Sequence, residues 1–221
     1  MYLLMHFLSQ YYEIILFYIY FFCFYLTNLY FFKRKKAMNI TAFHHAFFST
    51  FFGFYSLFIN DNQFHPFLYN FTTGYFLFDA SYLFYFKPFS SMTYAYFYHH
   101  VASIYLLNNT PNHKLTSSIV SFAELSNIPS YFVTHHLINN SIIIPSSRID
   151  HDNTRKLFIW LRIQKWSYVL IRIPILGIFT MYAFARYFNH FPVIFSTPVY
   201  FMGLYWSKIL LTRKSRSYIT N

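Results

Sequence analysis

The chain has 221 residues, of which 56% are hydrophobic, 26% aromatic and only 10% charged, whereas a soluble domain averages about a quarter charged residues. Its 32 Phe and 23 Tyr residues are more than one soluble core of this length buries, which excludes an ordinary water-soluble domain and indicates a polytopic membrane protein. The formal charge of +11 does not indicate nucleic-acid binding, because the basic residues form short clusters between apolar runs and not one continuous face.

Seven apolar segments are predicted to cross the membrane as helices, since about 20 mostly apolar residues span a bilayer. They comprise residues 11–32, 41–60, 67–86, 91–107, 115–134, 157–181 and 191–211. The fourth is short, and Pro174 and Gly177 are expected to kink the sixth. The first is expected to remain in the mature protein, because its positive charges follow the apolar run and no small-residue cleavage site accompanies it.

The basic clusters predict the orientation of these segments. With seven spans, every rich cluster falls on the same side: Lys33, Arg34, Lys35 and Lys36, then Lys87, then Arg148, Arg155 and Lys156, and finally Arg213, Lys214 and Arg216. The opposite side receives "NDNQFHP", "NNTPNHK" and "FNHFP", which contain one Lys between them. Because cytosolic loops carry the excess of Lys and Arg, we expect a lumenal N-terminus and a cytosolic C-terminus.

Acidic and histidine side chains are predicted at one depth of the membrane. Asp79 precedes Lys87 by eight residues, His99 follows Ser91 by eight, and Glu124 precedes Thr134 by ten. At 1.5 Å rise per residue, these positions lie about 12–15 Å from the cytosolic ends of their helices. An ionised side chain at that depth costs at least about 2.5 kcal/mol, so these residues and His100 are expected to face the bundle interior and pair. Such a cluster either ties helices together or serves proton transfer.

Segments throughout the chain resemble the TLC domain. In chain order they are "AFHHAFFSTFFGFYS" (42–56), "GYFLFD" (74–79), "YHHVASI" (98–104), "FAELSNIP" (122–129), "WSYVLIRIPILGIF" (166–179) and "GLYWSKIL" (203–210). That superfamily includes ceramide synthases, the translocating-chain-associating protein and several lipid-homeostasis proteins. The apolar segments predict an all-α bundle of about seven transmembrane helices, and the resemblance covers the last six. Six of them would form a TLC-like domain at 40–212, after an anchor and basic cytosolic loop at 1–39 and before a basic cytosolic tail at 213–221.

The resemblance also implies candidate site residues. In ceramide synthases a histidine pair, with two aspartates three residues apart on the next helix, is implicated in acyl transfer from acyl-CoA to a sphingoid amine. His99 and His100 match the pair, while Glu124 and Asn127 stand where the aspartates would be. With Glu124 and Asn127 in place of the two aspartates, the segment "ELSNIP" resembles the non-synthase branch more closely, whose members are tied to membrane lipid composition. We therefore expect a role in lipid metabolism or homeostasis in the endoplasmic reticulum membrane, with membrane lipids as partners.

A ceramide-synthase-like acyltransferase is the alternative. In that reaction His99 or His100 would act as general base, Asp79 and Glu124 would orient it, and acyl-CoA would be the cosubstrate. Arg162 and Lys165 would then contact phosphate, or else simply form the basic flank of a span. No bound cofactor or metal is expected, and the sequence leaves the oligomeric state open.

Two further functions rank lower. The chain contains three histidine pairs, and clustered histidines hold two irons in membrane desaturases; the pairs are His44 with His45, His99 with His100, and His135 with His136. No further histidine follows any pair at helical spacing, so the outer pairs are expected to be interfacial residues with one edge in water. A buried Asp/Glu/His chain also suits lipid or proton transport, but no internal repeat typical of transporters is present.

Overall fold

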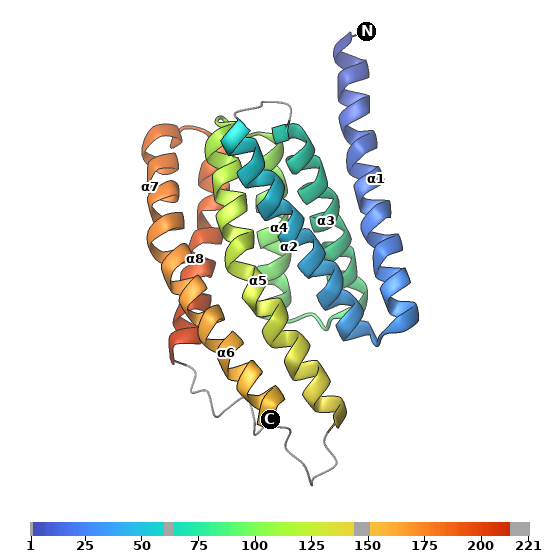
Figure 1. The fold of residues 1–221 in the computed structure, drawn as a ribbon. Helices are drawn as coiled ribbons and strands as arrows, with labels where there is room; N and C mark the ends of the chain where they lie inside the picture. The colour runs from blue at the N-terminus through green and yellow to red at the C-terminus, as the bar shows by residue number, and fades with distance from the viewer. Residues whose placement is uncertain (1, 60–63, 144–150, 213–221) are drawn as a thin grey trace.

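The computed structural model describes residues 2–59, 64–143 and 151–212, and in these ranges the chain is entirely helical, without a strand (Figure 1). The helices are α1 (Tyr2–Phe31), α2 (Arg34–Ile59), α3 (Phe64–Phe86), α4 (Ser91–Asn108), α5 (His113–Ile143), α6 (His151–Ser167), η1 (Tyr168–Ile175), α7 (Leu176–Tyr187) and α8 (Phe191–Thr212). Each predicted segment is confirmed as a helix, and α6, η1 and α7 together form the sixth. Arg148 and the tail at 213–221 lie outside the described residues.

The helices lie side by side and alternate in direction. In Figure 1 the turns α1–α2 and α3–α4 lie at one end of the bundle, and the turns α4–α5 and α7–α8 lie at the opposite end. Lys33 and Lys87 therefore lie at the same end, which we call the basic end, together with the first described turns of α6 that carry Arg155 and Lys156. The described basic clusters thus lie at one end of the bundle, as the charge pattern predicts.

The contact between α2 and α5 is made of small and polar residues, whereas aromatic residues such as Phe21 and Phe71 form a buried cluster between α1 and α3. The buried face of α2 contains Ala37, Asn39, Thr41, Ala42, His45, Ala46, Ser49, Thr50, Gly53 and Ser56. It packs against α5, whose buried residues include Thr116, Ser117, Ser121, Glu124 and Ser126. A soluble amphipathic helix buries its large apolar side chains, so the α2–α5 contact has the reverse of the pattern found in a water-soluble bundle. Small residues at helix contacts are typical of helices that associate in lipid.

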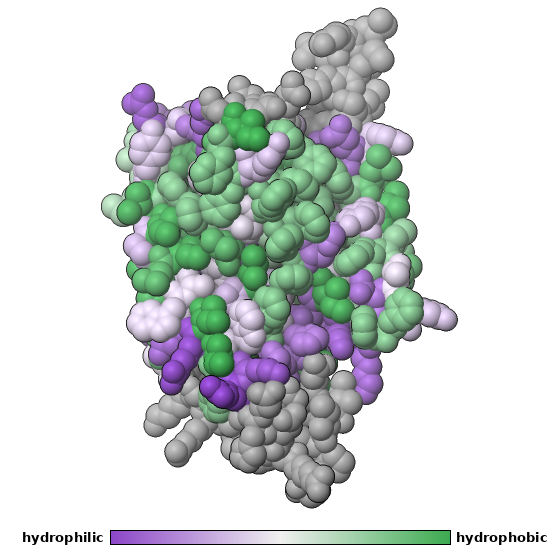
Figure 2. All heavy atoms as spheres, in the orientation of Figure 1, coloured by the Kyte–Doolittle hydropathy of each residue, from purple (hydrophilic) through white to green (hydrophobic). Residues whose placement is uncertain are grey.

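The large apolar side chains lie mainly on the outside. Examples are Phe58, Tyr85, Ile178 and Met181, which are exposed by 86, 76, 66 and 73%. Figure 2 shows apolar side chains spread over the middle of one face of the molecule, with polar residues gathered toward its two ends. Such a large exposed apolar surface indicates contact with a membrane or with another protein.

Two helical segments of the described chain are long and apolar enough to cross a membrane, judged by length and composition. They are Tyr11–Phe31 and Arg155–Tyr187. The first lies in α1 and the second covers α6, η1 and α7. The composition of these two segments thus supports association with a membrane. Helices such as α2 and α5 do not meet this criterion because their polar faces lower their mean hydropathy.

The sixth predicted segment is irregular, as its Pro174 indicated. Residues Tyr168–Ile175 form a π-helix that contains Pro174 and joins α6 to α7. Proline lacks a backbone N–H and clashes with the preceding turn of an α-helix, so a local widening of the helix accommodates it. Both Tyr168 and Arg172 are buried within this segment. The π-helix thus directs a tyrosine and an arginine into the bundle.

Candidate functional site

A short contact joins His100 of α4 to Asp79 of α3. The Nε2 atom of His100 lies 2.7 Å from Oδ2 of Asp79, and the two side chains are 6% and 17% exposed. The Nδ1 atom of His100 is buried and has no hydrogen-bond partner among the described residues. An ionised carboxylate can only accept, so with Asp79 ionised Nε2 carries the proton of this contact. The structure thus brings together two of the predicted site residues.

His99 faces a different part of the interior. Successive residues of a helix point about 100° apart, so the two neighbouring histidines of α4 cannot share one environment. The ring of His99 lies edge-on to Phe76 and Trp206, with centroid distances of 5.9 and 6.3 Å. Its Nδ1 atom is buried without a hydrogen-bond partner in the described part of the chain. Both histidines thus have a buried Nδ1 without a partner among the described residues, and His99 differs from His100 in lacking a contact to Asp79.

Glu124 and Asn127 of α5 form the second polar group. The Nδ2 atom of Asn127 donates to Oε2 of Glu124 at 3.2 Å, which is the helical i, i+3 contact. The Oδ1 atom of Asn127 accepts from Nη2 of Arg172 at 2.7 Å and from the hydroxyl of Tyr168 at 2.9 Å. Asn127 thus lies between an acid and a base and links them through one amide group.

Arg172 is a site residue that the sequence analysis missed. It is 8% exposed, its Nε donates to Oγ of Ser126 at 2.9 Å, and its guanidinium lies 4.4 Å from the centre of the Tyr168 ring. The ring of Trp206, on α8, has its centre 5.8 Å from the same guanidinium. The sequence does contain a signal for this residue, since Arg172 is the single arginine in the apolar run 168–179. Charged residues within membrane segments are rare and usually functional.

His45 corrects another expectation. It was expected near the cytosolic face with one edge in water, but it is 0% exposed. The expectation is wrong because α2 begins at Arg34 and not at residue 41, which moves His45 about 16 Å into the helix. Its ring stacks on Tyr75 at 3.9 Å, and its Nδ1 lies 3.9 Å from Oε2 of Glu124, beyond hydrogen-bond distance.

His44 and the third histidine pair lie apart from this group. The Nε2 atom of His44 lies 2.6 Å from the hydroxyl of Tyr20 on α1, so this imidazole joins the first two helices. His135 and His136 are partly exposed near the basic end of α5. Among the described residues, no group of three or more His, Cys, Asp or Glu side chains is placed to hold a metal ion.

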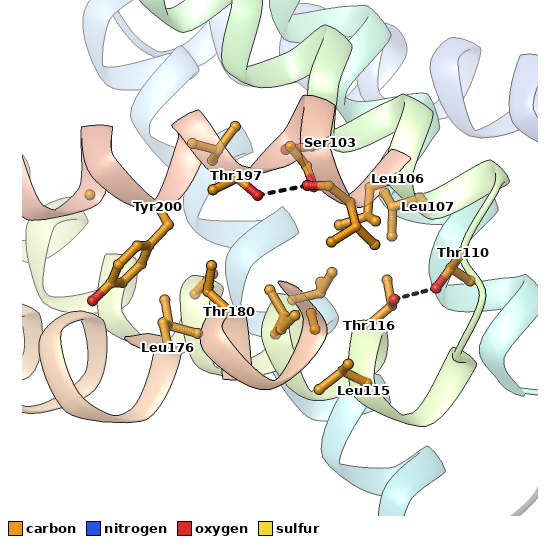
Figure 3. A pocket seen from close by; sticks show the side chains of 18 of the residues that line it. Ser103, Leu106, Leu107, Thr110, Leu115, Thr116, Leu176, Thr180, Thr197 and Tyr200 are labelled. Carbon is orange, nitrogen blue, oxygen red and sulfur yellow. Dashed lines mark hydrogen bonds between the residues drawn. The ribbon is translucent and has the colours of Figure 1, made fainter. Parts of the chain in front are cut away.

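A cavity of about 130 Å³ lies beside the polar groups, between α4, α5, α7 and α8. His99, Glu124, Asn127 and Arg172 line one part of it. The remainder is mainly apolar and reaches the α4–α5 turn, where Thr110 and Asn112 lie. Figure 3 shows this direction: Thr110, Leu115 and Thr116 lie at one end of the cavity, Leu176 and Tyr200 at the other, and Thr180 and Thr197 between them.

The cavity does not extend toward the basic end. Arg162 is exposed, and neither it nor Lys165 lines the cavity. These two residues, which the sequence offered as phosphate contacts, are thus separate from the polar end of the cavity. The wall includes His99 but neither Asp79 nor His100, so the Asp79–His100 pair is not part of the cavity lining.

Short sequence segments alone carry the resemblance to the TLC domain. A comparison of the chain with protein-family models, with curated proteins and with solved structures found no match. Membership of that family therefore stays a prediction, and the cavity with its polar end is the observation that bears most directly on function.

Proposed function

We propose that this chain is a seven-span membrane protein that holds a lipid in its interior cavity and acts in lipid metabolism or membrane lipid homeostasis. The observation that carries this proposal is the cavity itself, which is mainly apolar but ends at His99, Glu124, Asn127 and Arg172. Ligand cavities of this composition bind an apolar body and orient it by a few polar groups. A lipid has that division between an apolar chain and a polar head.

The membrane topology is supported by the distribution of residues. Large apolar side chains cover the outside, small and polar residues fill the α2–α5 contact, and basic clusters share one end of the bundle. Seven crossings place the N-terminus in the lumen and the C-terminus in the cytosol. Location in the endoplasmic reticulum and a TLC-like domain at residues 40–212 belong to the same proposal and rest on the resemblance.

An acyltransferase is the second candidate, and the place of His99 in the cavity wall favours it. In this reaction an acceptor amine attacks the carbonyl carbon of an acyl-CoA thioester. The C–N bond forms, the C–S bond breaks, the amine proton passes to His99, and the leaving thiolate takes up a proton. His100, held by Asp79 next to His99, would act as a positioning residue.

The test is a comparison of total lipid profiles in cells that express the wild type, His99→Ala/His100→Ala, or His135→Ala/His136→Ala. The last variant is a matched control, because it removes another adjacent histidine pair that does not line the cavity. Equal abundance of the three proteins is verified first. We expect the wild type and the control to shift a lipid class and the first double variant to lose that shift.

The lipid class whose abundance changes distinguishes the acyltransferase from the homeostasis role. Accumulation of an N-acylated lipid that is lost in His99→Ala/His100→Ala supports the acyltransferase. A change in phospholipid or sphingolipid proportions without a new acylated product supports the homeostasis role. Identical lipid profiles with and without the wild-type protein contradict both.

A further inference from the structure

The unequal ends of the cavity indicate what kind of lipid it holds. We infer that the ligand is a single-chain amphiphile with an anionic head group, which lies against Arg172 while the chain extends toward the α4–α5 turn. This inference rests on the proposed lipid function and names the ligand class of the same cavity. A long-chain carboxylate and a single-chain phosphate share the required chemistry, namely a compact anion on one apolar chain.

Arg172 is a buried cation without a contacting anion. Its two hydrogen-bond acceptors, Ser126 and Asn127, are neutral, and no carboxylate among the described residues lies within ion-pair distance of it. A guanidinium carries five N–H donors, and these two bonds use only two of them. A buried charge is costly unless it is paired, so the residue is well placed to receive an anion.

The free edge of the guanidinium lies at the cavity wall beside Gly203 of α8. A Cβ atom at Gly203 would lie 3.2 Å from Nη1 of Arg172, and both residues line the cavity. No hydrogen bond from Nη1 is present in the described part of the chain. A side chain at Gly203 would crowd Nη1, so the glycine keeps this donor free, and Nη1 together with the second N–H of Nη2 can bind a carboxylate or phosphate through two parallel bonds.

Glu124 limits where the head group can lie. This carboxyl group lines the same cavity but lies on the far side of Asn127 from Arg172. A ligand anion next to Glu124 would be repelled, whereas the Arg172 side attracts it. The two charges therefore select one position for the anion and should influence its binding in opposite directions.

The rest of the cavity suits one hydrocarbon chain. Leu107, Ile119, Val120 and Ala183 line it between the polar end and the α4–α5 turn. From Asn127 back to Leu115 the wall formed by α5 is about 18 Å long. A single cavity of this length suits one extended chain better than the paired chains of a diacyl phospholipid.

The experiment measures binding of radiolabelled oleate to the purified full-length protein in phosphatidylcholine nanodiscs. Unlabelled oleate, oleoyl lysophosphatidate and the neutral oleyl alcohol compete for the site. We expect saturable oleate binding and at least about tenfold weaker competition by the alcohol, because charge-assisted bonds to Arg172 distinguish the heads. Stronger competition by lysophosphatidate identifies a phosphate ligand, and weaker competition identifies a carboxylate; either supports the inference.

Variants test the residues separately. We expect Arg172→Gln to weaken oleate binding about tenfold or more, Glu124→Gln to strengthen it several-fold, and Ala183→Trp to block every ligand. Arg186→Gln, an exposed arginine that does not line the cavity, is the matched control and should bind as the wild type does. Should Arg172→Gln fail to fold, the ratio of oleate to alcohol affinity in the wild type still decides the question.

The failures are distinguishable. Equal affinities for oleate and oleyl alcohol, both lost in Ala183→Trp, overturn the anionic head group and leave the proposed lipid cavity intact. Absence of saturable binding by any of the three ligands contradicts the lipid cavity as well.

Discussion

Gly53 of α2 lies so close to Ser121 of α5 that a Cβ atom added at Gly53 would be 1.8 Å from the Ser121 Oγ. The Ser121 hydroxyl is itself held by donation to the backbone oxygen of Ser117 at 2.6 Å. Lipid provides no hydrophobic force between helices, so this close packing of small residues is the kind of contact that holds membrane helices together. It also sets the separation of α2 and α5 on which the His45–Glu124 distance depends.

Substitution of Gly53 by Ala should lower the stability of the protein. The added methyl group overpacks the α2–α5 contact, and we expect a loss of about 1–3 kcal/mol in the free energy of unfolding. Unfolding of the purified protein in one detergent measures this change. The double variant Gly53→Ala/Ser121→Gly removes the clash and should recover most of the loss, apart from about 1 kcal/mol for a glycine within α5. A Gly53→Ala protein as stable as the wild type would contradict the close approach.

The Asp79–His100 contact should be visible as an energetic coupling. We expect a double-mutant cycle with Asp79→Ala and His100→Ala to give a coupling energy of about 0.5–3 kcal/mol, because either single change leaves a buried polar group without its partner. Unfolding measurements on the four proteins give this value. A parallel cycle with Asp79→Ala and His99→Ala is the control and should couple less. Equal coupling in the two cycles would show that Asp79 does not distinguish the histidines.

Arg172 should not be replaceable by lysine. A lysine ammonium cannot bond Ser126 and Asn127 in the fork geometry of the guanidinium, nor stack in the same way on Tyr168. We expect Arg172→Lys to lower the free energy of unfolding by about 1–3 kcal/mol. Arg186→Lys, at an exposed position of α7, should change it by less than about 0.5 kcal/mol. Equal effects at the two positions would mean that the Arg172 contacts add no stability.

The seven-span topology should appear in cysteine labelling. In a Cys23→Ser background, Lys35→Cys and Lys87→Cys should react with an impermeant maleimide when only the plasma membrane is permeabilised. Asn109→Cys and His190→Cys should react only after full solubilisation. If α1 and α6–α7 alone crossed the membrane, Lys87 and Asn109 would lie on one side and label together. The comparison of Lys87 with Asn109 therefore decides between two spans and seven.

The helices and one site contact were predictable because both depend on local rules. Apolar runs of sufficient length predict helices, and all seven expected segments are helical. The helices α3 and α4 are antiparallel neighbours joined by a short turn, so residues equally distant from that turn lie at one level. Counting from Lys87 and Ser91 was enough to place Asp79 beside the histidine pair.

The partners of Glu124 were not predictable in the same way. Arg172 reaches Asn127 from a π-helical segment, and the change of helical pitch there shifts which residues face inward, so counting along an α-helix gives the wrong face. His45 lies beside Glu124 because α2 extends seven residues further toward the basic end than its apolar run does. The sequence predicts where an apolar run begins, but a helix continues through polar residues when they pack against a neighbour.

The polar face of α2 affects how the protein is made. On the proposed topology, α2 enters the membrane before the helix whose Tyr131 backbone oxygen accepts from the buried Asn39 and whose Ser121 packs on Gly53. That helix, α5, begins at His113, more than fifty residues after α2 ends at Ile59, and translation at roughly 5–20 residues per second needs several seconds to reach it. Unsatisfied polar groups in hydrocarbon cost several kcal/mol each. We therefore expect another protein at the insertion site to cover this face of α2 until α5 is synthesised.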